Sequence, residues 1–187
     1  MERDRRRGAA VFLRLGARGA VGLGQRARRQ HRQRGPRGGP VSALSPIIPL
    51  RDALREHLRK ADAFKALALG RIYDEVPTGK ATAPYAYLGP MRHQRLEIGC
   101  GLAWTVQARI FAVSTENGRA QVWSLADAMT AALDGLEAFD PPLAAPFSLQ
   151  KMIEVTQAGD VIDPLQAKSV FLDLTTIIAR PLPGQED

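Results

Sequence analysis

The chain changes character at about residue 40, and only the part that follows has the composition to build a hydrophobic core. Residues 1–40 contain 12 arginines, no lysine and only two acidic residues, Glu2 and Asp4, so this segment carries a net charge of +10. Its eight glycines interrupt helical and strand periodicity and leave little apolar surface to offset the entropy lost on ordering. We therefore expect residues 1–40 to be disordered and residues 41–187 to fold as a single domain.

The arginine-rich segment allows two interpretations. It is either an arm that binds nucleic acid through the phosphates, or a translated upstream region of a gene whose true start is Val41. We favour the second, because GTG serves as a bacterial start codon and a well-organised sequence begins within a few residues of Val41. An export signal is not expected, since Arg14 and Arg18 interrupt the best apolar stretch, residues 9–23.

Residues 41–187 are mildly acidic, with a net charge of −3, so the sequence pI of 10.2 reflects the first segment. A chain of this length can bury about two-thirds of its unfolded surface. Cys100 is the single cysteine, which excludes an intrachain disulfide framework and fits a reducing bacterial cytoplasm. No stretch approaches the roughly 20 apolar residues that span a bilayer, so we expect no membrane partner.

Apolar residues recur at intervals of three and four in three segments, which predicts three amphipathic helices. The first covers residues 46–61. The second covers residues 62–69, with Asp62 as its N-cap and Gly70 closing it. The third extends from Val122 to Leu136. The expected apolar stripes are Ile47, Leu50, Leu54, Leu58 and Ala61 in the first helix and Val122, Leu125, Ala126, Met129, Leu133 and Leu136 in the third.

Strand composition or period-two alternation marks five further segments. They are residues 71–74, 84–88, 102–113, 148–156 and 168–178. We expect the second strand to end at Gly89 and Pro90, and a loop to cover residues 160–164 after the fourth strand. The order α-α-β-β-β-α-β-β, with connections too short for several crossovers, predicts an α+β fold in which a largely antiparallel sheet carries helices on one face.

Catalytic and ligand-binding motifs are absent from the sequence. Residues 79–82 resemble the end of a phosphate-binding loop, but Ala81 replaces the hydroxyl and Pro84 blocks the helix that should follow. His31, His57 and His93 lack the spacing of zinc ligands, and no second cysteine supports them. We therefore expect no enzyme activity, no catalytic residues, no cofactor and no metal.

Two blocks of sequence suggest a family. They are residues 70–77, which read GRIYDEVP, and residues 83–89, which read APYAYLG. Followed by the long strand and the third helix, they resemble the tail-completion or tail-terminator proteins of long-tailed phages, prophages and gene transfer agents. The resemblance covers residues 44–180. The sequence departs from the family pattern at residues 112–114 and 91–101.

This resemblance implies a structural protein that assembles as a ring, of six copies in this family, on top of the completed tail tube. The ring would stop tube growth and meet the head–tail connector protein, while DNA passes through without specific binding. The protein would assemble in the bacterial cytoplasm and end at the head–tail junction of a phage-like particle. We expect assembly contacts from exposed sheet faces and from residues 76–83 and 157–165. The candidate interface residues are Asp74, Glu75, Pro77, Lys80, Tyr85, Trp123, Asp160 and Asp163.

Two other functions remain open at the level of sequence. One is a nucleic-acid-binding protein that uses the arginine-rich arm, with the domain as a scaffold. The other is a different head–tail connector protein, such as a stopper, since small α+β ring-forming proteins share this composition.

Overall fold

The computed structural model describes residues 45–79, 81–98, 101–116, 118–162 and 167–181. The expectations for residues 1–40 and for Cys100 fall outside these ranges.

Three helices form where the apolar spacing predicted them: α1 (Ile47–Lys60), α2 (Asp62–Ala68) and α3 (Ala120–Leu133). Their stripes are buried at Leu50, Leu54 and Leu58 in α1 and at Val122, Leu125, Ala126, Met129 and Leu133 in α3. The predicted N-cap is wrong, because Ala61 occupies that position and Asp62 is already helical. Leu69 and Gly70 both take positive φ angles, 53° and 71°, and so turn the chain away from α2.

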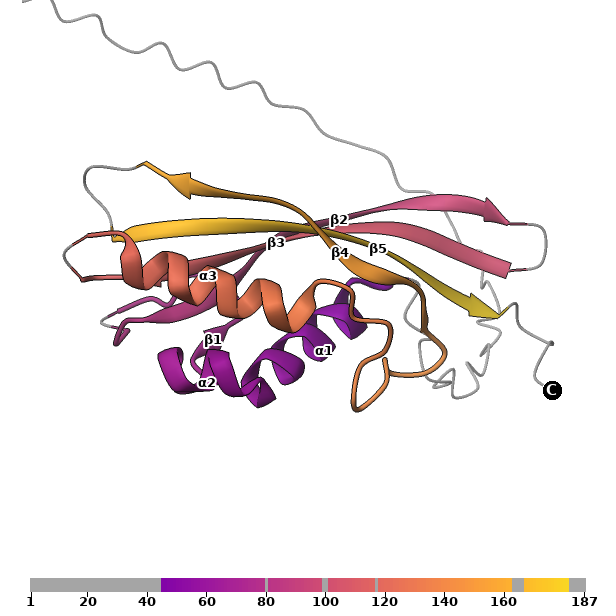
Figure 1. Cartoon of the computed structure of the whole chain (residues 1–187). Helices are drawn as coiled ribbons and strands as arrows, with labels where there is room; N and C mark the ends of the chain where they lie inside the picture. Colours follow the sequence, from indigo (N-terminus) through magenta and orange to yellow (C-terminus); the bar gives the residue numbers. More distant parts are fainter. Residues whose placement is uncertain (1–44, 80, 99–100, 117, 163–166, 182–187) are drawn as a thin grey trace, which may run out of the picture. The chain divides into compact units, whose positions relative to one another are not determined.

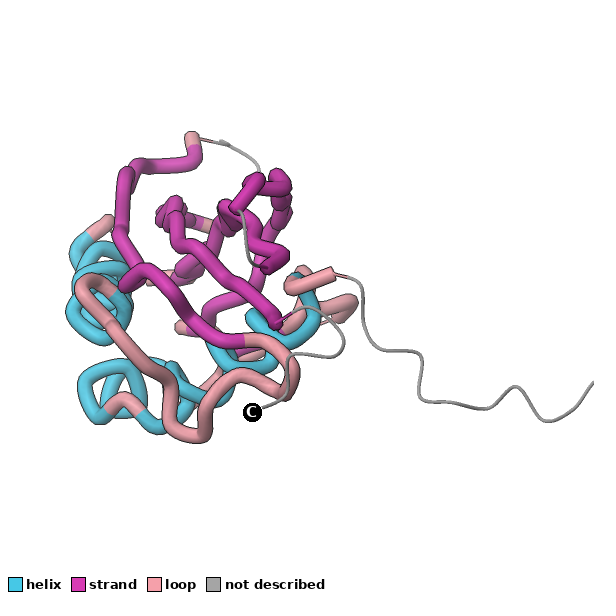
Figure 2. The backbone as a smooth tube through the Cα atoms, turned by 90° about the vertical axis from the view of Figure 1, so that its right-hand side faces the viewer, coloured by secondary structure: helices cyan, strands magenta, loops and turns pink. Residues whose placement is uncertain are grey.

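The five predicted strands form one sheet. They are β1 (Ile72–Tyr73), β2 (Tyr85–Ile98), β3 (Gly101–Ser114), β4 (Ser148–Val161) and β5 (Lys168–Pro181), in the spatial order β1-β2-β3-β5-β4. Only β1 and β2 pair in parallel, and every other ladder is antiparallel. The α+β class and the element order are thus confirmed. Figures 1 and 2 show the three helices on one face of the sheet.

Two strand ends differ from the prediction. Gly89 and Pro90 do not end β2, because they form an irregularity after which pairing resumes at Met91. A proline lacks a backbone donor, so the strand tolerates it at such an interruption rather than within the regular ladder. Likewise β4 continues through Val161, so residues 157–161 belong to a strand and Asp160 is not in a loop.

The core lies between the helices and the inner face of the sheet. Alternate residues of the central strands are buried, as period two predicts: Val106, Ala108, Ile110 and Ala112 in β3, and Val170, Leu172, Leu174, Thr176 and Ile178 in β5. Thr176 is the one polar member of these two rows, and its hydroxyl donates to the carbonyl oxygen of Lys151 at 2.5 Å. The hydroxyl therefore crosses to the neighbouring strand and is not left unsatisfied in the core.

The outer face of the sheet carries a row of aromatic side chains that no described helix covers. Tyr87 stacks on Phe111 with 4.7 Å between ring centroids, and Phe111 lies opposite Phe171 in the β3–β5 ladder. Glycines lie beneath two of these rings. A Cβ on Gly89 would come within 2.6 Å of Phe111, and one on Gly159 within 2.8 Å of Phe171.

These contacts predict that alanine is tolerated differently at the two glycines. At Gly89 the new methyl group would also lie 3.0 Å from the carbonyl oxygen of Arg109, so backbone as well as a ring must move. Gly89→Ala should lower the free energy of unfolding by about 1–3 kcal/mol. Gly159→Ala should cost less, because only the ring of Phe171 must move. Urea denaturation measures both values, and an equal or reversed order would contradict the predicted packing.

Candidate assembly interface

Asp74 and its neighbours lie where the short strand β1 ends. Both carboxylate oxygens of Asp74 accept hydrogen bonds from the Arg55 guanidinium at 2.9 Å, and Arg51 donates to the Asp74 carbonyl oxygen at 2.7 Å. These contacts hold the end of β1 against α1. Glu75 is exposed and Pro77 is half-buried in the segment that follows. Asp74 therefore has a structural role within the chain whatever its role in assembly.

Tyr85 lies at the start of β2, beside the same strand. Its ring meets that of Tyr73 edge to face, with centroids 5.6 Å apart. Burial raises the pKa of Tyr85, and the neighbouring Tyr73 phenol adds to the rise. Burial also raises the pKa of Tyr87, with a further contribution from Tyr85. Tyr85 and Tyr87 thus remain neutral phenols, and with Tyr73 they form an aromatic cluster at this edge of the sheet.

Trp123 and Asp160 lie together near the opposite edge of the sheet. Asp160, on β4, forms an ion pair with Arg119 at 2.5 Å, and Arg119 is the N-cap residue of α3. The Trp123 amide donates to the Arg119 carbonyl oxygen at 3.1 Å, and the Trp123 side chain is half-buried against the core. This cluster ties one half of β4 to the start of α3.

The predicted interface residues therefore divide into two groups. Asp74, Glu75, Pro77 and Tyr85 lie beside β1, whereas Trp123 and Asp160 lie beside β4, and β1 and β4 are the two outer strands of the sheet. Lys80 and Asp163 lie outside the described residues. The predicted interface residues that the structure describes thus lie at opposite edges of the sheet rather than in one patch.

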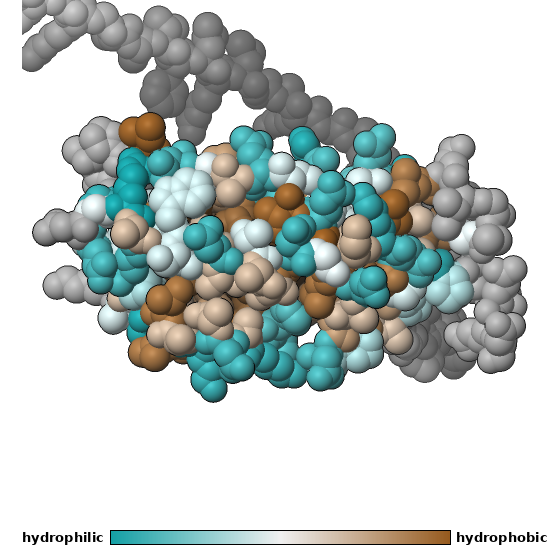
Figure 3. Space-filling model, in the orientation of Figure 1, coloured by the Kyte–Doolittle hydropathy of each residue, from teal (hydrophilic) through white to brown (hydrophobic). Residues whose placement is uncertain are grey.

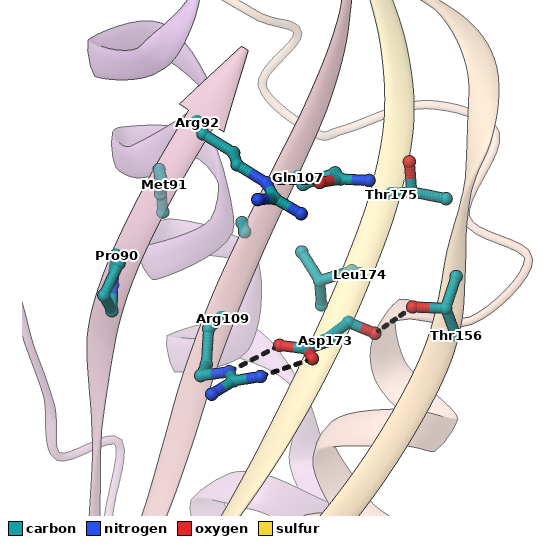
Figure 4. A pocket seen from close by; sticks show the side chains of 10 residues that line it. Pro90, Met91, Arg92, Gln107, Arg109, Thr156, Asp173, Leu174 and Thr175 are labelled. Atoms are coloured by element: carbon teal, nitrogen blue, oxygen red, sulfur yellow. Dashed lines mark hydrogen bonds and ion pairs between the residues drawn. The ribbon is translucent and has the colours of Figure 1, made fainter.

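A shallow depression on the outer face of the sheet was missed at the level of sequence. Arg109 of β3 and Asp173 of β5 lie directly opposite each other there and form two hydrogen bonds of 2.6 and 2.7 Å (Figure 4). The Arg109 guanidinium also lies 4.2 Å from the centroid of the Phe171 ring. Thr156 of β4 donates to the Asp173 carbonyl oxygen at 3.2 Å. Strand alternation places Arg109 on the outer face, but only the strand register brings Asp173 beside it.

The depression offers polar contacts without a catalytic arrangement. Among the described residues no three His, Cys, Asp or Glu side chains gather as metal ligands would. The hydrogen bonds from Arg109 lower the pKa of Asp173, which keeps it an acceptor rather than a proton donor. On the side seen in Figure 3, apolar residues are interspersed with polar ones. In the described part of the chain no helix has the length and apolarity to span a bilayer.

The described residues thus form an α+β domain whose largely antiparallel sheet has one helix-covered face and two outer strands. A family model described as tail completion protein gp17 matches residues 52–179. The chain belongs to this family and is a structural protein of phage tails.

A solved structure supports the same fold. It is described as the virion of a native gene transfer agent (GTA) particle, and one of its chains matches with a TM-score of 0.64 at 21% sequence identity. The match covers 73% of this chain and 99% of that chain. No curated protein matches this sequence.

The Arg109–Asp173 pair predicts a pH dependence in acid. Because the pKa of Asp173 in the folded chain lies below its ordinary value of 3.8, the pair stabilises the fold above that pH. This contribution is lost as the pH falls through the lower folded value. Both side chains are partly exposed, so we expect about 1 kcal/mol or less.

Asp173→Asn should therefore lower the free energy of unfolding at neutral pH, and the difference from the unsubstituted chain should shrink in strong acid. Urea denaturation across the acid range measures it. Asp127→Asn, at an exposed position on α3, is the matched control and should change little at either pH. A difference for Asp173→Asn that does not depend on pH would contradict the role assigned to the pair.

Proposed function

We propose that this chain is a tail terminator. Six copies form a ring that caps the completed tail tube, stops its growth and joins it to the head of a phage-like particle. The ring assembles in the bacterial cytoplasm and remains at the head–tail junction. The observation that carries this proposal is the family match over residues 52–179, which extends from α1 to β5 and so includes both outer strands of the sheet.

The proposed contacts follow from the exposed surfaces. The open face of the sheet and residues 76–83 and 157–165 would meet neighbouring copies, the tail tube protein and the head–tail connector protein. Val76 and Ile162 are 56% and 82% exposed, which is unusual for large apolar side chains and supports contacts in both segments. Each seam of a stable ring would need about 800 Å² from each partner.

The charge of the folded part supports passage of DNA through the ring. Residues 41–187 carry a net charge of −3, whereas a strongly basic lumen would retain the phosphates. DNA would therefore pass through the channel without specific binding.

Deleting the gene from a producing strain tests this function. A terminator limits tube length and completes the joint, so particles without it should show separate filled heads and tails of abnormal and variable length. Electron microscopy of purified particles measures tail length and the fraction of joined particles. The full chain supplied from a plasmid is the control and should restore both.

Normal, joined tails in the deletion strain would contradict the proposal. Restoration by the full chain but not by residues 41–187 would favour a role for the arginine-rich segment.

A further inference from the structure

The two outer strands of the sheet are both accessible at the same end. At one edge, β1 pairs only through Ile72 and Tyr73, which lie beside Ala86 and Tyr87 of β2. The other edge is β4. Figure 1 shows β1 and the end of β4 on opposite sides of this end of the sheet. Unpaired backbone groups on outer strands favour the addition of a further strand.

Only one half of β4 is available for such pairing. Around Ile153 the edge is already covered, because the Ile153 amide donates to the Leu136 carbonyl oxygen at 2.9 Å and its carbonyl oxygen accepts from the Gly135 amide at 2.8 Å. Residues 157–161 are paired with β5 in continuous register, without the irregularities that interrupt the first half. No hydrogen bond between described residues covers the outer side of this half.

Residues 157–161 of β4 lie at the same height along the strands as β1, on the other side of the sheet. Continuous register connects Tyr73 to Tyr87, Tyr87 to Phe111, Phe111 to Phe171, and Phe171 to Gly159. Three antiparallel ladders separate β2 from β4, so β2 and the parallel β1 both run opposite to β4. Suppose that a second copy lies beside the first in the same orientation. Its β1 would then run antiparallel to residues 157–161 of the first copy, and neither copy would need to shift along the strand direction.

The side chains at the two edges are compatible with this arrangement. Gly159, the residue of β4 level with Tyr73, has no side chain of its own to meet the Tyr73 ring of a neighbour. Past β1 the chain carries the exposed acid Glu75, and the residue of β4 that would lie level with it, Gln157, is exposed and uncharged, so no like charges meet there.

We propose that residues 157–161 of β4 pair antiparallel with β1 of a second copy of this chain, in a head-to-tail seam that repeats around the ring. The proposal rests on the ring assembly put forward above and specifies its contact. Because the two edges differ, each seam leaves one β1 and one β4 edge free, so addition continues until the ring closes.

Cysteine cross-linking in particles tests the seam. By extension of the register, Glu75 lies level with Gln157, and both are exposed. In a deletion strain, the full chain would carry Cys100→Ser with Glu75→Cys and Gln157→Cys. Oxidised particles should then yield a ladder of disulfide-linked multimers on a non-reducing gel, since a disulfide needs Cα atoms within about 7 Å. The matched control pairs Glu75→Cys with Gln150→Cys, which is exposed in the covered half of β4, and should yield none.

A second pair, Arg71→Cys with Val161→Cys, which the same register places level and on one face, is used if the first does not restore normal tails. Particles with normal tails but no ladder from either pair would overturn the seam and leave the terminator function standing. Dimers from Gln157→Cys alone would also overturn it, because they indicate a two-fold contact between β4 edges. Failure of the terminator function itself would appear separately, as normal tails in the deletion strain.

Discussion

Burial of a single face of the sheet is the constraint on which the other features of this protein depend. The apolar stripe of α3 covers the alternate side chains of β3 and β5, and α1 packs beside α3 over β1 and β2. Each fully buried leucine or isoleucine there contributes roughly 1.5–3 kcal/mol. Within the described residues the three helices form one covering layer, and all of them lie on the same side of the sheet. The opposite face and the two outer strands are therefore left for solvent or for partners.

The outer surface shows how a folded subunit can keep this exposed sheet stable before assembly. The rings of Phe111 and Phe171 lie over Gly89 and Gly159, and the Arg109–Asp173 pair bridges the two central strands. The edge of β4 around Ile153 is covered, because the turn that follows α3 forms backbone hydrogen bonds with Ile153. On β4 the accessible edge is thereby reduced to residues 157–161, which limits pairing with unrelated strands there and suits a specific contact with a neighbouring copy.

Much of the fold follows from the sequence because side-chain periodicity depends on local geometry. The helical stripe from Val122 to Leu133 and the alternation in β3 and β5 both place the correct residues in the core. Strand ends were predicted less well. Gly89 and Pro90 are typical of a turn, but cross-strand pairing with β3 continues past them. Residues 157–161 are polar enough for a loop, yet their pairing with β5 makes them a strand.

The candidate surface shows a similar division between local and long-range information. The blocks at residues 70–77 and 83–89 pointed to the family, and the family match confirms it. Sequence could not predict that Asp74 pairs with Arg55, or that Asp160 pairs with Arg119, because these contacts depend on how separate elements pack. The sequence also could not predict that β1 and residues 157–161 of β4 lie at the same height along the strands, because this depends on the strand register.

The central claim is that this chain forms a terminating ring at the head–tail junction, and a cryo-electron microscopy map of that junction in purified particles tests it most directly. The proposed function predicts one ring of this fold between the last layer of the tail tube and the head connector. Density for this fold at the opposite end of the tail, or a junction that lacks it, would contradict the claim.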